Sequence, residues 1–84
     1  IVIVANDSAY GAEHIQFIDR QMDPSLAMFS WPSFAEVATT LGGEGIEVAS
    51  VDDLEIAMTA IQKRSKPLLI ELKLDPNDVP RMRL

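Results

Sequence analysis

The stretch V-A-N-D-S-A-Y-G-A-E-H, residues 4–14, joins an apolar run to a short polar turn and then to a helical pattern. The apolar run, residues 1–5, is typical of a strand that is buried on both faces in a parallel sheet. After the turn, apolar residues recur at helical spacing, which predicts a helix that begins near Gly11 and ends before Asp23. A strand that leads directly into a helix is the first unit of an α/β fold.

Two further helices carry the sequence signals of their first turns. Ser33 and Glu36 have the spacing of a capping box in front of an apolar stripe, and Gly42 follows where that stripe ends. Ser50 and Asp53 repeat the capping pattern in front of a second stripe that reaches residue 61. We therefore expect amphipathic helices after Ser33 and after Ser50.

Short strands are expected at residues 46–49 and 68–74, with proline-punctuated loops at 23–32 and 75–80. The order strand, helix, helix, strand, helix, strand predicts an α/β fold. Its complete form would be a three-layer α/β/α domain with a largely parallel sheet, of which this chain supplies a part. The type and spacing of four residues further predict that they fill the core: Met22, Met28, Met58 and Phe34.

Composition excludes several classes of function. The chain has 84 residues, 48% of them hydrophobic, no cysteine and a formal net charge of −6. An acidic chain does not offer the basic face that a nucleic acid needs. No apolar stretch reaches the roughly 20 residues that cross a bilayer, and no basic leader precedes one. Without cysteine there is no disulfide framework, so we expect a cytoplasmic protein that binds neither nucleic acid nor membrane.

The polar turn has the position of a ligand site. In parallel sheets, ligands bind beyond the carboxyl ends of the strands, and a helix start there favours a phosphate. Asp7 is itself an anion, and Mg²⁺ would reconcile the two because it bridges carboxylates to phosphates. A simpler interpretation is that Asn6, Asp7 and Ser8 are turn and cap residues, for which their side chains are well suited.

Four segments together resemble one enzyme family. N-D-S-A-Y-G, residues 6–11, resembles the end of the thiamine diphosphate motif of acetolactate synthases, pyruvate decarboxylases and benzoylformate decarboxylases. That motif begins with Gly-Asp-Gly, which this chain lacks, and closes with Asn-Asn or Asn-Asp. P-S-F-A-E-V-A-T-T-L-G-G-E-G-I-E-V, V-D-D-L-E-I-A-M-T-A-I and K-P-L-L-I-E-L-K-L-D-P-N-D-V-P follow in the order of the family. The resemblance makes residues 1–84 the carboxyl-terminal portion of a thiamine-diphosphate-binding domain.

The resemblance implies a role for each residue of the turn. The Asp7 side chain and the Ala9 carbonyl would bind Mg²⁺, although asparagine is commoner than aspartate at the position of Asp7. Asn6, Ala9, Tyr10 and Gly11 would bind the cofactor, the last two through backbone amides that approach its diphosphate.

Glu13 matches an active-site glutamate of the pyruvate decarboxylases, whereas acetolactate synthases are apolar there. In the matching branch it is a catalytic residue that moves protons, and His14 is a candidate to extend that role. The simpler alternatives are that Glu13 stabilises the first turn of a helix through the macrodipole, and that His14 is a surface or cap-proximal residue.

The resemblance implies an enzyme that decarboxylates or carboligates a 2-oxo acid with thiamine diphosphate and Mg²⁺. Its partners would be the remaining domains of the parent chain, in a homodimer or homotetramer, and the present chain alone would be inactive. The alternative is a non-catalytic α/β interaction module derived from such a domain, because fold does not dictate function.

Overall fold

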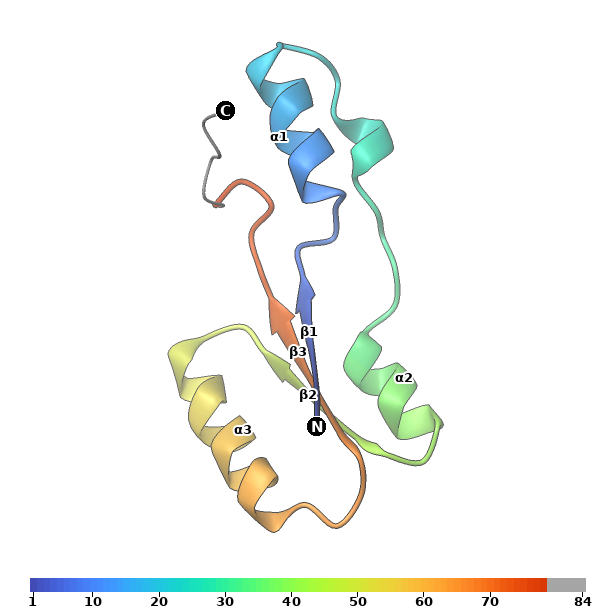
Figure 1. Cartoon of the computed structure of the whole chain (residues 1–84), viewed down its shortest axis with the longest axis vertical. Coiled ribbons are helices and arrows are strands. Elements are labelled where there is room, and N and C mark those ends of the chain that lie inside the picture. Colours follow the sequence, from blue (N-terminus) through green and yellow to red (C-terminus); the bar gives the residue numbers. More distant parts are fainter. Residues whose placement is uncertain (79–84) are drawn as a thin grey trace. The chain divides into compact units, whose positions relative to one another are not determined.

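A computed structural model describes residues 1–78 of the chain. Its elements are β1 (Val2–Asn6), α1 (Gly11–Asp19), the 3-10 turn η1 (Ser25–Ala27), α2 (Phe34–Thr40), β2 (Glu44–Val48), α3 (Val51–Lys63) and β3 (Leu68–Lys73) (Figure 1). They group into two compact units, one of residues 1–6 and 32–73, the other of residues 7–31 and the segment from residue 74. The expected order of strands and helices is confirmed, and the last two residues of the expected 75–80 loop lie outside the described residues.

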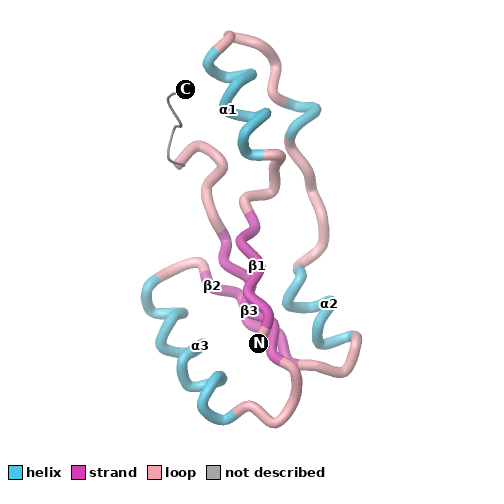
Figure 2. The backbone as a smooth tube through the Cα atoms, viewed as in Figure 1, coloured by secondary structure: helices cyan, strands magenta, loops and turns pink. Residues whose placement is uncertain are grey.

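The first unit is built on a parallel three-stranded sheet of order β1-β3-β2 (Figure 2). Val2 of β1 and Gly45 of β2 both lie opposite Leu69 of β3, so the central strand fixes the register of both neighbours. The helices between the strands supply the crossovers that parallel pairing requires. The α/β class and the parallel sheet are thus confirmed, and the complete three-layer domain stays a prediction.

Alternation along β3 separates two environments. Leu68 and Ile70 are buried with Val48 of β2 and Ala57 of α3, which makes this face the apolar core. Glu71 points to the opposite face, where its carboxylate accepts a hydrogen bond from the amide of Ala35 in α2. One face of the sheet is therefore apolar, and the other carries a buried charge.

The first strand differs from its expected burial. Val2 is 56% exposed and Ile3 is 63% exposed, because β1 is an edge strand that pairs only with β3. The expected burial on both faces is wrong within the described residues, although the strand itself is confirmed.

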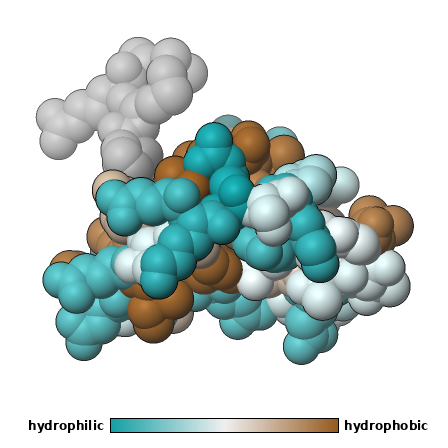
Figure 3. Space-filling view, turned by 90° about the horizontal axis from the view of Figure 1, so that it is seen from below, coloured by the Kyte–Doolittle hydropathy of each residue, from teal (hydrophilic) through white to brown (hydrophobic). Residues whose placement is uncertain are grey.

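A groove of about 390 Å³ is lined largely by apolar side chains, among them Val2 of β1, Phe34 of α2 and Leu41 directly after α2. Apolar side chains are visible among polar ones on the outer surface (Figure 3).

Helix α3 shows how much apolar surface the helices leave exposed. Met58, on α3, is 57% exposed, and Met22 and Met28 are 52% and 37% exposed, so the expectation that these methionines fill the core is wrong. On α3, Met58 thus follows the helical spacing of apolar residues without being buried.

The longest helix is α3, with 13 residues, and within residues 1–78 no helix combines the length and the apolar character needed to cross a membrane.

Each expected capping box forms its bond from the N3 amide to the serine hydroxyl. Ser33 Oγ accepts a hydrogen bond from the Glu36 amide at 3.2 Å. At the start of α3, Ser50 Oγ accepts from the Asp53 amide at 3.3 Å, and Asp53 Oδ2 accepts from the Ala49 amide at 2.8 Å. Both helices thus satisfy first-turn amides locally.

Replacing the α3 cap tests this local contribution. Ser50→Ala removes one acceptor from the first turn, so we expect a loss of about 1 kcal/mol in the free energy of unfolding, measured by urea denaturation. Thr59→Ala on the exposed part of the same helix is the control, with an expected change within about 0.5 kcal/mol. Equal losses in the two variants would contradict a capping role for Ser50.

Candidate functional site

The turn after β1 is organised by the Asp7 side chain. Asp7 Oδ1 accepts a hydrogen bond from the Ala9 amide at 3.0 Å, which is the geometry of an Asx turn. Between them, Ser8 has a φ of 57°, in the left-handed region that non-glycine residues seldom enter. The backbone thus turns at Ser8, and the Asp7 carboxylate is held against the amide of the residue two positions later.

A single antiparallel bridge orients the backbone of Ala9. Ala9 lies opposite Met28, and the two bonds of the bridge run from the Tyr10 amide to the Ala27 carbonyl and from the Phe29 amide to the Ser8 carbonyl, each at 2.8 Å. In this type of pair the opposed residues do not bond to each other, so the amide and carbonyl of Ala9 both point away from Met28. The Ala9 amide bonds to Asp7, and by the same pairing we expect the Ala9 carbonyl to point to that side.

The helix that follows begins next to this carboxylate without a side-chain cap. Helix α1 has no side-chain cap from Tyr10, so its first amides, on residues 11–13, are not satisfied by the N-cap residue. A Cβ added to Gly11 would lie 2.7 Å from Asp7 Oδ2, so the carboxylate sits directly over this glycine. The amide of Tyr10 bonds to Ala27, which leaves Gly11 rather than Tyr10 as the residue whose amide can face a diphosphate in this structure.

The donor chemistry of the turn fits Mg²⁺ and a diphosphate. A carboxylate and a carbonyl are the oxygen ligands that Mg²⁺ prefers, and open amides at a helix start favour phosphate. Asp7 and Ala9 supply only part of a coordination sphere, and residues 1–78 contain no group of three His, Cys, Asp or Glu side chains that could hold a metal alone. Any ion bound here would complete its shell with water, phosphate or other protein groups.

Asn6 lies in a different environment from the rest of the motif. It ends β1, is 4% exposed, and donates from Nδ2 to Glu71 Oε2 at 2.6 Å. The Glu71 side chain is fully buried, and its other oxygen accepts from the Ala35 amide at 3.1 Å and from Ser33 Oγ at 3.4 Å. This carboxylate therefore links β3 to β1 and to the start of α2.

The surroundings of Glu71 favour its charged form. Burial alone raises the pKa of the carboxyl, but hydrogen bonds from Asn6, Lys73 and the Ala35 amide outweigh it and lower the pKa from 4.5 to about 2. Lys73 Nζ lies 2.9 Å from Glu71, and this hydrogen bond raises the pKa of Lys73 in turn. The positive end of the α2 dipole acts in the same direction, because Ala35 lies in the first turn of that helix.

The sequence prediction did not include Glu71. Its signal is a single charged residue inside the apolar strand sequence L-L-I-E-L, residues 68–72. A carboxylate in such a strand must be hydrogen-bonded or paired, so this position could have been marked as a buried polar site. Its partners come from distant parts of the chain and could not have been named from the sequence.

The two remaining candidates have opposite exposures. Glu13 is exposed on the first turn of α1, so the burial that would tune it for proton transfer is not provided within residues 1–78. His14 is 4% exposed, and its Nε2 lies 2.8 Å from Asn77 Oδ1. Its Nδ1 is buried and has no hydrogen-bond partner among the described residues. A surface position for His14 is therefore wrong, and the residue connects α1 to the segment after β3.

Three aromatic side chains support the bridge from one side. The Tyr10 and Phe29 rings meet edge to face at a centroid distance of 4.6 Å, and Phe29 stacks on Trp31 at 4.9 Å. Tyr10 nevertheless remains 61% exposed, so it is not a core residue. The contact between Tyr10 and Phe29 therefore joins the two segments that the Ala9–Met28 bridge pairs.

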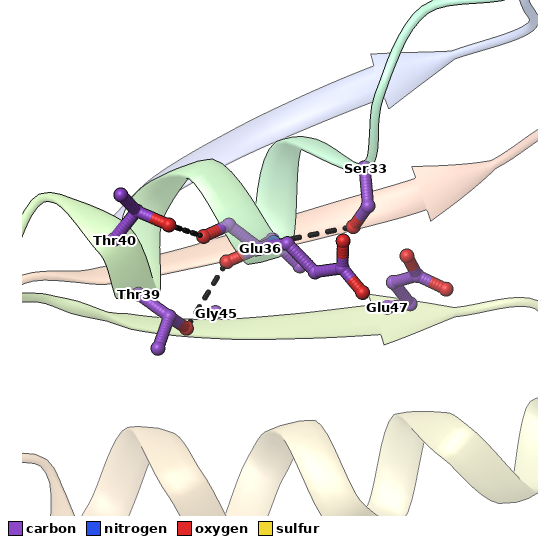
Figure 4. A pocket seen from close by; sticks show the side chains of 7 residues that line it. Ser33, Glu36, Thr39, Thr40, Gly45 and Glu47 are labelled. Atoms are coloured by element: carbon purple, nitrogen blue, oxygen red, sulfur yellow. Dashed lines mark hydrogen bonds between the residues drawn. The ribbon is translucent and has the colours of Figure 1, made fainter.

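A separate pocket of about 540 Å³ lies between α2 and β2, and none of the expected site residues lines it. Glu36 and Glu47 lie at one end of this pocket near Ser33 (Figure 4). The hydroxyls of Thr39 and Thr40 donate back to helix carbonyls, so they are already satisfied. The pocket has an acidic end but no cationic side chain among its lining residues, so it does not suit a phosphate.

The chain is thus a small α/β protein with a parallel sheet and, before α1, a turn in which the Asp7 carboxylate bonds to the Ala9 amide. Comparison with protein-family models, with curated proteins and with solved structures gave no match. The likeness to thiamine diphosphate enzymes therefore depends on the sequence motifs, and its implications for function are taken up as proposals.

Proposed function

We propose that the segment from Asp7 to Gly11 binds Mg²⁺ and the diphosphate of thiamine diphosphate in an enzyme that decarboxylates or carboligates a 2-oxo acid. The observation that carries the proposal is that the Asp7 carboxylate bonds to the Ala9 amide across a tight turn, while the bridge to Met28 leaves the Ala9 carbonyl without a bond to the opposite strand. Helix α1, which has no side-chain cap from Tyr10, follows directly. An Asx turn alone explains the bond between Asp7 and the Ala9 amide. It does not explain why the Ala9 carbonyl would be directed toward the same ion.

The residues of the turn would divide the work of binding. Asp7 and Ala9 would hold the ion, and the amide of Gly11 would face the diphosphate at the positive end of α1. When bound, thiamine diphosphate supplies the electron sink for breaking or forming the bond beside the substrate carbonyl. The substrate pocket, the remaining domains and the homodimer or homotetramer are part of the same proposal.

The test is a calorimetric titration of the natural full-length protein with thiamine diphosphate in the presence and absence of Mg²⁺. We expect binding that depends on Mg²⁺ and that weakens at least about 100-fold in Asp7→Ala, because an ion ligand is lost. Asp7→Asn keeps a side-chain oxygen, so its affinity should stay within about 10-fold of the wild type.

A matched control comes from a second Asx turn in the same unit. Asp23 Oδ1 accepts from the Ser25 amide at 3.0 Å, as Asp7 accepts from Ala9, but Asp23 lies outside the proposed site. Asp23→Ala should leave the affinity unchanged. An affinity that Asp7→Ala also leaves unchanged would overturn the ligand assignment, and a wild-type protein that binds no cofactor would favour the interaction module.

Glu13 carries the proposed acid/base role, and its test is separate from binding. Glu13→Gln removes the titratable group but keeps the shape, so we expect kcat for 2-oxo acid turnover to fall about 100-fold with cofactor affinity unchanged. Carbon dioxide release and product formation measure the rate. Undiminished turnover would leave Glu13 with only its favourable place in the first turn of the helix.

A further inference from the structure

We infer that Glu71 is a positioning residue, which fixes the Asn6 side chain at the end of β1, next to Asp7 in the sequence. The inference rests on the proposed function of that turn. Glu71 itself would touch neither ion nor cofactor. Its contribution would be the orientation of the residue that immediately precedes the ion ligand.

The geometry of the Asn6 amide supports this assignment. An asparagine side chain carries its donor and its acceptor on one planar group, so fixing Nδ2 also fixes the direction of Oδ1. The 2.6 Å bond from Nδ2 to Glu71 Oε2 is made to a charged acceptor, which is the stronger kind. Asn6 is 4% exposed and Glu71 is fully buried, so water does not compete for this bond.

The position of Asn6 in the sheet makes such a link necessary. Strand β1 is held along one side only, by β3, and Asn6 is its last residue. Beyond Asn6 the chain leaves the sheet, and the end of an edge strand is where fraying begins. The Glu71 carboxylate accepts a hydrogen bond from Asn6 at this end of β1 and another from the Ala35 amide in the first turn of α2. It therefore joins the end of β1 to α2.

The neighbouring acidic residue provides a matched comparison. Glu47 lies opposite Glu71 in the register of β2 and β3 and also approaches Lys73, at 4.0 Å. Its side chain is 46% exposed. Glu47→Gln thus removes a carboxylate from the same face of the sheet without touching the bond to Asn6.

The experiment is a double-mutant cycle on the natural full-length protein. The affinity for thiamine diphosphate with Mg²⁺ is measured for wild type, Glu71→Gln, Asn6→Ala and the double variant, at a temperature where circular dichroism shows each to be folded. We expect Glu71→Gln to weaken binding about 10-fold, because glutamine removes the charge and leaves one acceptor oxygen for the two donors, and to have no further effect in the Asn6→Ala background. Glu47→Gln should bind like the wild type.

The outcomes separate this inference from the proposed function. Absence of Mg²⁺-dependent binding in the wild type is a failure of the proposed function, and it is seen before any variant is made. Wild-type binding with unchanged affinity in folded Glu71→Gln, or with additive losses in the cycle, overturns the positioning role alone. Should Glu71→Gln not fold, the side-chain amide of Asn6 in the ¹⁵N-labelled wild type decides, because slow exchange with solvent supports the link and fast exchange overturns it.

Discussion

Glu71→Leu is expected to lower the free energy of unfolding by about 3–5 kcal/mol, the usual cost of removing one member of a buried charged network. Leucine replaces the carboxylate with an apolar side chain, but the donors that faced the carboxylate stay. The Asn6 side chain and the Ala35 amide, both buried, are then left without their acceptor. Urea denaturation of the natural full-length protein, followed by circular dichroism, measures the loss.

The control for this loss is Glu47→Gln. Glu47 shares Lys73 with Glu71, but its side chain is 46% exposed, and exposed ion pairs contribute little. We expect a change within about 0.5 kcal/mol. If both variants lost the same stability, the effect would come from net charge on this face and not from the buried hydrogen bonds.

The same carboxylate makes stability depend on acid pH. Its pKa is about 2 in the folded chain and 4.5 ordinarily, so folding favours the charged form. Its stabilising contribution is present above pH 4.5 and is lost as pH falls toward 2, with a total of about 3 kcal/mol. The difference in unfolding free energy between wild type and Glu71→Leu should therefore shrink over this range. A difference that stays constant between about pH 5 and about pH 2 would show that the charge of Glu71 does not contribute.

Local signals account for the parts of the fold that the sequence predicted. The helices after Ser33 and Ser50 begin where capping residues and an apolar stripe coincide, and both caps form. These signals lie within a few residues of each other, so the sequence alone determines them. The alternation of strands and helices then restricts the fold to the α/β class.

Other features depend on contacts between distant segments. The exposure of β1 follows from its place at the sheet edge, and no pattern within residues 1–5 reveals which strand lies at an edge. The Tyr10 amide donates a hydrogen bond to the Ala27 carbonyl, 17 residues further along the chain. This bond depends on the Ala9–Met28 bridge, which the sequence does not reveal. Glu71 likewise acquires its role from Asn6 and Ala35, which adjoin it only after folding.

Gly45→Ala is expected to cost about 3 kcal/mol or more of unfolding free energy, because the backbone of α2 lies against this glycine. A Cβ at this position would lie 1.9 Å from the carbonyl oxygen of Ala35 and 2.6 Å from its Cα. The atoms in the way are backbone atoms, so rotation of a side chain cannot relieve the overlap, and α2 must move away from β2. Such a shift would also pull the Ala35 amide from Glu71, which adds the loss of a buried hydrogen bond.

Gly42→Ala is the matched control, since the two glycines lie three residues apart and differ in what surrounds them. Gly42 has a φ of 95° and open space where its Cβ would lie, so alanine there meets only the strain of a left-handed backbone, about 1 kcal/mol. Thermal and urea unfolding of both variants should place Gly45→Ala well below Gly42→Ala in stability. The reverse order would mean that α2 does not pack against β2 at Gly45, and the path from Ala35 to Glu71 and Asn6 would lose its structural basis.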